Sequence, residues 1–255
     1  MAIWLVLVRK EVVEALRSMK AVWLPLVFIL LGAMQPITSY YMPEILKHAG
    51  NMPEGSIIQI PVPSAGEVLA QTLSQYGTLG LLIVALAFMG MISSEINSGT
   101  ASFTLVKPVG RTSFFLSKWA AALLLVWLSF AAGFGASWYY TVLLIGAPDA
   151  GAVVQGFLLY GLWLSFVVTL TLLFSSLLRS PAGAAFASLG TAAVLAVASS
   201  LFPHAWQPGL LAGIAAEAVQ AAANPKATAV VMITAAATAL AAVLACLSMK
   251  RKALP

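Results

Sequence analysis

Long apolar runs alternate with short polar stretches along the whole chain. The hydrocarbon core of a bilayer is ~30 Å thick, so about 20 helical residues are enough to cross it. Six runs are of about this length, and they are continuously apolar, whereas the strands of a membrane β-barrel alternate. We therefore predict an all-α integral membrane protein with one transmembrane domain over residues 1–255. The spans are expected near residues 21–41, 77–94, 119–145, 153–178, 182–202 and 227–249.

The first twenty residues have an amphipathic pattern. Apolar positions recur at nearly helical spacing, and polar positions such as Arg9, Lys10 and Glu14 surround the other side. This pattern predicts a helix over residues 1–20 that lies in the cytoplasmic interface of the membrane. The plainer alternative, a helix that only anchors the first span, is favoured at this stage. The apolar positions are Leu5, Val8, Val12, Ala15, Leu16 and Met19.

A helix start is also encoded before the second span. Ser64 is followed three residues later by Glu67, which is the spacing of a capping box. Leu69, Leu73 and Tyr76 then form an apolar stripe at helical spacing. We expect this helix to lead directly into the second span.

The stretch between the fifth and sixth spans, residues 202–226, is apolar but broken by Pro203, Pro208, Gly209 and Pro225. These breaks favour short re-entrant helices over a seventh full span. Such helices would form an outer gate, but a hydrophobic lid on the bundle fits the pattern equally well.

Composition and charge support a membrane protein and orient it. Only 8% of the residues are charged and 61% are hydrophobic. If the N-terminus is cytoplasmic, the outer segments contain only Lys47 and Lys226 out of 13 Lys and Arg residues. This bias matches the positive-inside rule, so we predict a multi-pass protein of the cell membrane with both termini in the cytoplasm. The net charge of +5 then reflects contact with an anionic inner leaflet, and no nucleic-acid partner is expected.

The sequence offers little catalytic or metal-binding chemistry. Cys246 is the single cysteine, and His48 and His204 stand without ligand partners nearby in the sequence. None of the predicted spans contains an acid or a base, which disfavours ion-coupled carriers and intramembrane hydrolases. The chain also lacks a phosphate-binding loop and any soluble block that would hold a nucleotide. We therefore do not expect an enzyme, and any energy for transport must come from a partner.

A polar island over residues 93–119 separates the second and third spans. Glu95 is expected to close the second span and Gly99 to cap its C-terminal end. Thr100 is expected to cap a short interfacial helix, which must stop at Lys107 because Pro108 follows.

The faces of this short helix are predicted as well. Phe103 should face inward, whereas Lys107, Arg111 and Lys118 should face lipid headgroups or another protein. Thr112 is a candidate cap for the third span.

The island resembles a known family. The patterns E-x-x-x-G-T, K-P-V-x-R and F-F-L-x-K look like the ABC-2 type permease subunits of ABC exporters. Most of the chain fits that family's layout of an interfacial N-terminal helix, six spans and a coupling helix between spans two and three. The residues that carry the resemblance are Glu95, Gly99, Thr100, Lys107, Pro108, Val109, Arg111, Phe114, Phe115, Leu116 and Lys118.

The resemblance implies a function. The chain would be the permease subunit of an ATP-driven exporter and would form a path for an amphiphilic substrate such as a peptide, lipid or drug. Residues 95–118 would dock into a separate ATP-binding cassette subunit, which would hold ATP and Mg²⁺, so that this chain carries no cofactor. A second permease subunit, identical or paralogous, would complete the path. The residues implied in coupling are Glu95, Gly99, Thr100, Phe103, Lys107, Pro108, Arg111 and Lys118.

Other interpretations stay open at this stage. The island is also explained by an ordinary positive-inside loop, and the chain by a stand-alone immunity or resistance protein or an ion-independent carrier. On the third span, Ser129, Gly133, Ser137 and Thr141 form a stripe of small residues that permits close helix contact. Such a stripe packs within one subunit more often than between two.

Overall fold

Helices account for nearly all of the described chain. The computed structural model describes residues 2–49, 63–100, 110–202 and 206–251, and no strand occurs among them. In chain order the elements are α1 (Ala2–Arg17), α2 (Lys20–Ala49), α3 (Ala65–Gln75), the π-helical segment η1 (Tyr76–Gly80), α4 (Leu81–Phe88), α5 (Ser93–Asn97), α7 (Arg111–Leu144), α8 (Ala150–Leu177), α9 (Pro181–Leu201), α10 (Leu210–Ala218) and α11 (Ala227–Arg251).

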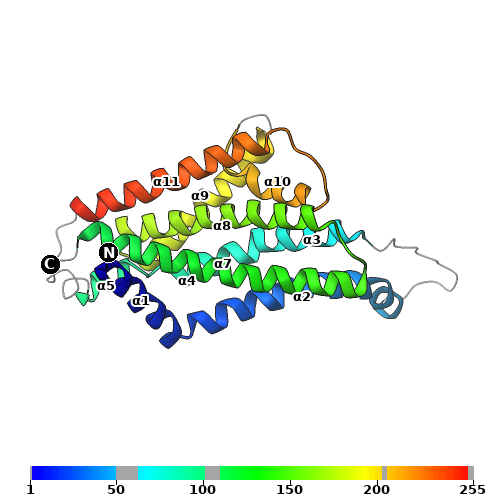
Figure 1. Ribbon diagram of the computed structural model, residues 1–255, viewed down its shortest axis with the longest axis horizontal. Helices are drawn as coiled ribbons and strands as arrows, with labels where there is room; N and C mark the ends of the chain where they lie inside the picture. The colour runs from blue at the N-terminus through cyan, green and yellow to red at the C-terminus, as the bar shows by residue number, and fades with distance from the viewer. Residues whose placement is uncertain (1, 50–62, 101–109, 203–205, 252–255) are drawn as a thin grey trace.

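Six helical stretches of the described residues are long and apolar enough to cross a bilayer, which confirms the predicted fold class. The long helices run side by side along the molecule, with α7 and α8 in the middle (Figure 1). Several helices are longer than the predicted spans, most clearly α7, which begins at Arg111 instead of near residue 119. The stretches are Lys20–Ile45, Ala65–Asn97, Arg111–Leu144, Ala150–Leu177, Pro181–Leu201 and Ala227–Lys250.

The N-terminal helix α1 leaves the bundle at an angle to α2 (Figure 1). The two helices meet at Met19, whose φ of +58° lies in the left-handed region. The face of α1 that packs on α7 and α2 contains Leu7 and Glu11, and both are buried. Leu5 and Leu16 from the predicted apolar face are exposed. The interfacial position of α1 in a membrane stays a prediction.

The second span is built from several pieces. It begins as expected, because Ser64 and Glu67 form the predicted capping box and α3 continues directly into η1 and α4. Leu69, Leu73 and Tyr76 are buried, as their spacing predicted. Beyond α4 the helix is interrupted at residues 89–92 and resumes as α5. Proline does not cause this interruption, since none occurs in the segment.

A close crossing of α2 and α7 explains the stripe of small residues on the third span. A Cβ atom at Gly133 would lie 2.5 Å from the carbonyl oxygen of Phe28, so only glycine fits there. The Tyr76 hydroxyl donates to that same carbonyl at 2.8 Å, and the hydroxyls of Thr72 and Ser137 are hydrogen-bonded at 2.8 Å. Small residues let helix backbones approach, and here they do so within one chain.

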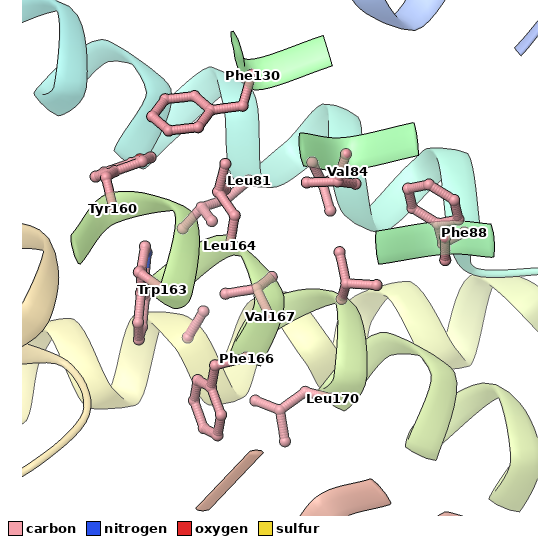
Figure 2. Close-up of a cluster of buried hydrophobic side chains, with 14 of the residues drawn as sticks. Leu81, Val84, Phe88, Phe130, Tyr160, Trp163, Leu164, Phe166, Val167 and Leu170 are labelled. Carbon is pink, nitrogen blue, oxygen red and sulfur yellow. The ribbon is translucent and has the colours of Figure 1, made fainter. Parts of the chain in front are cut away.

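Helix α8 lies at the centre of the bundle and contacts α4, α7, α9, α10 and α11. Aromatic and aliphatic side chains of α4, α7 and α8 meet around it (Figure 2). Phe130 of α7 stacks on Phe157 of α8 with ring centroids 5.0 Å apart. Trp127 donates to the hydroxyl of Ser165 at 3.0 Å. Phe130 therefore belongs to the core, and Trp127 is half-buried against α8.

The segment after α9 forms one short helix, α10, over Leu210–Ala218 among its described residues. It packs against α8 and α3. The approach is close, since a Cβ atom at Gly156 would lie 2.2 Å from the Cγ1 atom of Val219. This packing fits both a re-entrant helix and a lid, and the re-entrant depth stays a prediction.

Candidate coupling site

The first part of the polar island folds as its residues predicted. Gly99 follows α5 with φ of +74°, and its N–H donates to the carbonyl of Ile96 at 3.2 Å. Glycine takes this left-handed conformation without the steric cost of a Cβ atom. The hydroxyl of Thr100 donates back to the carbonyl of Glu95 at 3.2 Å. Residues 95–100 thus close the C-terminal end of the second span with a defined turn.

Three of the predicted coupling residues, Phe103, Lys107 and Pro108, lie outside the described residues. The short interfacial helix that they were expected to form stays a prediction. The helix cap proposed for Thr100 falls partly in the same region.

The predicted cap of the third span is wrong. Helix α7 begins at Arg111 with Gly110 at the cap position, and no side chain caps it, so Thr112 does not have this role. The guanidinium of Arg111 donates to the carbonyls of Met249 and Lys250, at 3.3 and 2.9 Å. A cation at the last carbonyls of a helix is favourable because these groups lack partners within the helix. Arg111 therefore ties α7 to the end of α11 in the same chain.

Lys118 does not face headgroups or another protein, as the sequence suggested. Its side chain is 1% exposed, and the ammonium lies 2.9 Å from the Oε2 atom of Glu11 and 2.8 Å from the Oε1 atom of Glu95. The same ammonium lies 5.1 Å from the ring centroid of Phe114. A buried charge is stable only when it is paired and hydrogen-bonded, and the two carboxylates provide both.

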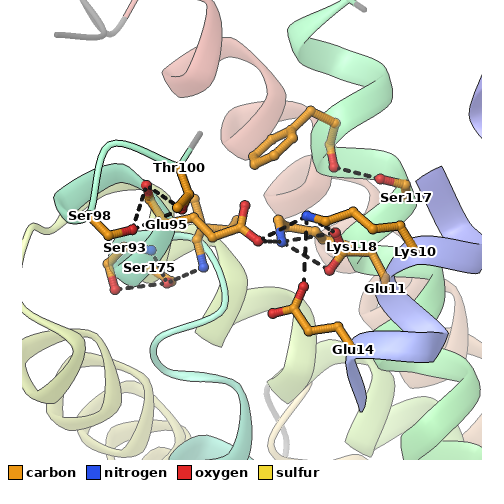
Figure 3. A network of polar contacts seen from close by, with 12 residues as sticks. Lys10, Glu11, Glu14, Ser93, Glu95, Ser98, Thr100, Ser117, Lys118 and Ser175 are labelled. Atoms are coloured by element: carbon orange, nitrogen blue, oxygen red, sulfur yellow. Dashed lines mark hydrogen bonds and ion pairs between the residues drawn. The ribbon is translucent and has the colours of Figure 1, made fainter. Parts of the chain in front are cut away.

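Lys10 and Glu14 extend this cluster toward its exposed edge (Figure 3). The Lys10 ammonium contacts the Oε1 atom of Glu95 at 3.2 Å and carboxylate oxygens of Glu11 and Glu14 at 3.4 and 3.7 Å. Burial lowers the pKa of Lys10, but the carboxylates of Glu11 and Glu95 outweigh it, so the pKa rises above its ordinary value.

These five residues, Lys10, Glu11, Glu14, Glu95 and Lys118, are called the charge cluster below. They join α1, α5 and α7, which are far apart in the sequence. Glu95 and Lys118 are the two ends of the predicted coupling segment, so the cluster clamps both ends together. The charge cluster thus connects this segment to the N-terminal helix and to two spans.

Comparison with known proteins identifies the family. The model of the family described as ABC-2 family transporter protein matches residues 5–252. The chain belongs to this family. Its sequence is also similar to the uncharacterized transmembrane protein YxlG of Bacillus subtilis (strain 168). The two are 38% identical over 210 residues, which cover 82% of this chain and 81% of the relative.

Membership gives the coarse role of the molecule. ABC-2 permeases are the membrane components of ABC transporters and have no ATPase site of their own. This ABC-2 protein is therefore a multi-pass membrane protein of the permease type. The resemblance seen in the polar island is confirmed.

Glu11 of this ABC-2 protein was not predicted as a site residue. It lies four residues after Leu7 and four before Ala15, so helical spacing placed it on the side that packs against the bundle. An acid on a buried face requires a cation, and Lys118 was available. The prediction that no span contains an acid or a base holds for the predicted spans, but the observed helices are longer than these spans. Glu95 and Lys118 lie inside the apolar helical stretches Ala65–Asn97 and Arg111–Leu144.

The charge cluster is held together by ion pairs between two ammonium groups and three carboxylates. Oxygens of Glu11, Glu14 and Glu95 lie within 4.8 Å of one another, which is close enough to share a cation. The ammonium groups of Lys10 and Lys118 already bind these oxygens and balance most of their charge.

A cavity of about 460 Å³ lies beside the charge cluster. It is bordered by Glu14 of α1, Trp23 of α2, Phe88 of α4 and Leu125 of α7. This space lies between α1 and α2 on one side and the C-terminal end of the second span on the other. Ser94 and Glu95 of α5 also border it.

Proposed function

We propose that this protein is the permease subunit of an ATP-driven exporter and that residues 95–118 dock into a separate ATP-binding subunit. One observation carries the proposal: the buried ammonium of Lys118 binds Glu11 and Glu95 at once. The predicted docking segment is thereby clamped at its base to two spans and to the N-terminal helix. An ordinary surface loop does not require a buried clamp, and burying one is costly.

The clamp gives docking a mechanical consequence. A displacement of the docked segment would reach α1 through Glu11, α5 through Glu95 and α7 through Lys118. Arg111 would carry it to α11 through the carbonyls of Met249 and Lys250. Closure of the partner on ATP would then rock the spans between inward-facing and outward-facing arrangements.

The remaining parts of the proposal follow from the apolar spans and from the family. A second permease subunit, identical or paralogous, completes the path, and ATP and Mg²⁺ are bound by the partner. Apolar spans without central charges suit an amphiphilic substrate such as a peptide, lipid or drug.

The proposal is tested with Gly99→Val, which places a β-branched residue at φ of +74°. A Cβ atom there meets no other atom within 4 Å, so the cost is conformational, about 1–2 kcal/mol. The segment should change its path while the spans stay intact. The control is Gly213→Val in α10, where a Cβ atom also meets nothing within 4 Å and the backbone is helical.

We expect the purified chain alone to hydrolyse no ATP. A co-expressed ATP-binding cassette subunit should co-purify with the chain, and its ATPase activity should be higher in the complex than alone. Gly99→Val should reduce stimulation several-fold at normal membrane abundance, whereas Gly213→Val should not. Normal stimulation in Gly99→Val would remove the docking assignment. Failure of the wild-type chain to bind any such subunit would favour a stand-alone membrane protein.

A further inference from the structure

The interruption of the second span at residues 89–92 leaves two backbone amides without their usual acceptors. In a continuous helix, Ile92 would donate to the carbonyl of Phe88 and Ser93 to that of Met89. Here the Phe88 carbonyl accepts from Met91 at 3.1 Å instead. The helix is therefore broken between α4 and α5, directly before the segment that contains Glu95.

One side chain of α8 compensates for this break. The hydroxyl of Ser175 accepts from the N–H groups of Ile92 and Ser93 at 3.2 and 3.1 Å. It donates to the carbonyl of Met89 at 2.7 Å. One buried hydroxyl thus binds backbone groups on both sides of the break. Figure 3 shows Ser175 beside Ser93.

Such compensation is required within an apolar bundle. A buried N–H group without an acceptor costs free energy, and lipid offers no water to replace one. Without the Ser175 hydroxyl the break would have to close into a regular helix or open to another partner. Either change would alter the backbone path into α5 and therefore the orientation of this five-residue helix.

The orientation of α5 decides where Glu95 points. Glu95 lies two residues after Ser93, and it reaches across to Lys118 at 2.8 Å. On the opposite side of α5, the side chain of Asn97 donates to the carbonyl of Arg179 at 2.6 Å. Contacts with the α8 side of the bundle therefore set the angle at which Glu95 meets the charge cluster.

We propose that Ser175 is a positioning residue for coupling: its hydroxyl latches a hinge at residues 89–92 and thereby holds Glu95 on Lys118. The latch extends the proposed function, because Glu95 is the base of the docking segment. When the latch is bound, α5 and the rest of the second span move as one piece. When it is released, α5 pivots into the adjoining cavity of about 460 Å³ and the charge cluster opens.

The chain provides a matched control at the next position. Ser176 is also buried on α8, but its hydroxyl contacts Ser248 of α11 at 2.7 Å and the carbonyl of Leu173 at 2.7 Å. Ser176→Ala removes the same atom one residue away without touching the break. Any effect specific to Ser175→Ala is then due to the latch and not to the loss of a buried hydroxyl on α8.

The first measurement is hydrogen exchange of the isolated chain in lipid nanodiscs, read by mass spectrometry over residues 92–98. Ser175→Ala removes the acceptor of two amides, so exchange there should rise about fivefold or more. Ser176→Ala should leave it at the wild-type rate. Unchanged exchange in Ser175→Ala would overturn the hinge.

The second measurement separates positioning from simple stability. Glu95→Gln is placed in the wild-type, Ser175→Ala and Ser176→Ala backgrounds, and thermal unfolding is followed for all six proteins. If Ser175 holds Glu95 on Lys118, Glu95→Gln should lower the Tm by the same amount in the wild-type and Ser176→Ala backgrounds. In the Ser175→Ala background the decrease should be less than about half as large. Equal shifts in all three backgrounds would show that Ser175 only stabilises the bundle, which would overturn the proposal.

Both measurements use the chain alone, so they decide the latch even if no ATP-binding subunit is found. With a partner in hand, Ser175→Ala should keep co-purification and lose stimulated ATPase about threefold or more. If the ATPase of the partner is stimulated as in wild type although the amides of residues 92–98 exchange faster, Ser175 has no role in coupling. The docking assignment would not be affected by that result. Loss of co-purification would show that Ser175 is needed for assembly of the complex, and it would also overturn the proposed positioning role.

Discussion

At the scale of single residues, Lys118 is the most consequential charge in the described part of the chain. Its ammonium is shared by Glu11 and Glu95, so Lys118→Met would leave the buried carboxylate of Glu11 beside that of Glu95 with only the half-exposed Lys10 as a cation. We expect a loss of about 3–5 kcal/mol, seen as a large drop in Tm or in membrane abundance. Lys10→Met is the matched control, because Lys10 contacts the same carboxylates but is 43% exposed. That variant should cost less than about 1 kcal/mol. Adding Glu11→Gln to Lys118→Met should restore part of the loss, and no restoration would show that packing and not charge explains the defect.

At the scale of elements, the closest helix contact is the crossing of α2 and α7. Gly133→Ala would place a methyl group 2.5 Å from the carbonyl oxygen of Phe28 and 2.6 Å from the hydroxyl of Tyr76. The backbone of α2 cannot make room for this methyl group unless the two helices move apart. We therefore expect the free energy of unfolding to fall by about 2 kcal/mol or more and the Tyr76 hydrogen bond to break. Gly135→Ala, two residues along the same helix, meets no atom within 4 Å and should be neutral or slightly stabilising. Equal thermal unfolding of the two variants would contradict this crossing.

The same contrast shows what sequence alone can predict about an element. Spacing identified the stripe around Gly133 and the capping box at Ser64, because both depend on local periodicity. It could not place Glu11 opposite Lys118 or Ser175 beneath the broken second span, because those pairings depend on which helices become neighbours.

At the scale of the whole molecule, the distribution of basic residues predicts that both termini lie in the cytoplasm, and the arrangement of the helices supports the same side for both. The contact of Arg111 with the carbonyls of Met249 and Lys250 places the start of α7 beside the end of α11. The charge cluster places α1 at that same end of the bundle, whereas α3 begins and α10 ends at the other end (Figure 1). Basic residues are retained on the cytoplasmic side during insertion, so this shared end should be the inner one.

The test uses a chain in which Cys246, the single cysteine, is replaced by alanine, and it introduces one new cysteine at a time. Ala2→Cys and Pro255→Cys should react with a membrane-impermeant maleimide only after cells are permeabilised. Gly55→Cys in the predicted first outer segment is the positive control and should react in intact cells. Labelling of both termini from outside intact cells would reverse the orientation and would put residues 95–118 out of reach of any cytoplasmic ATP-binding subunit. Labelling of one terminus alone would contradict six spans.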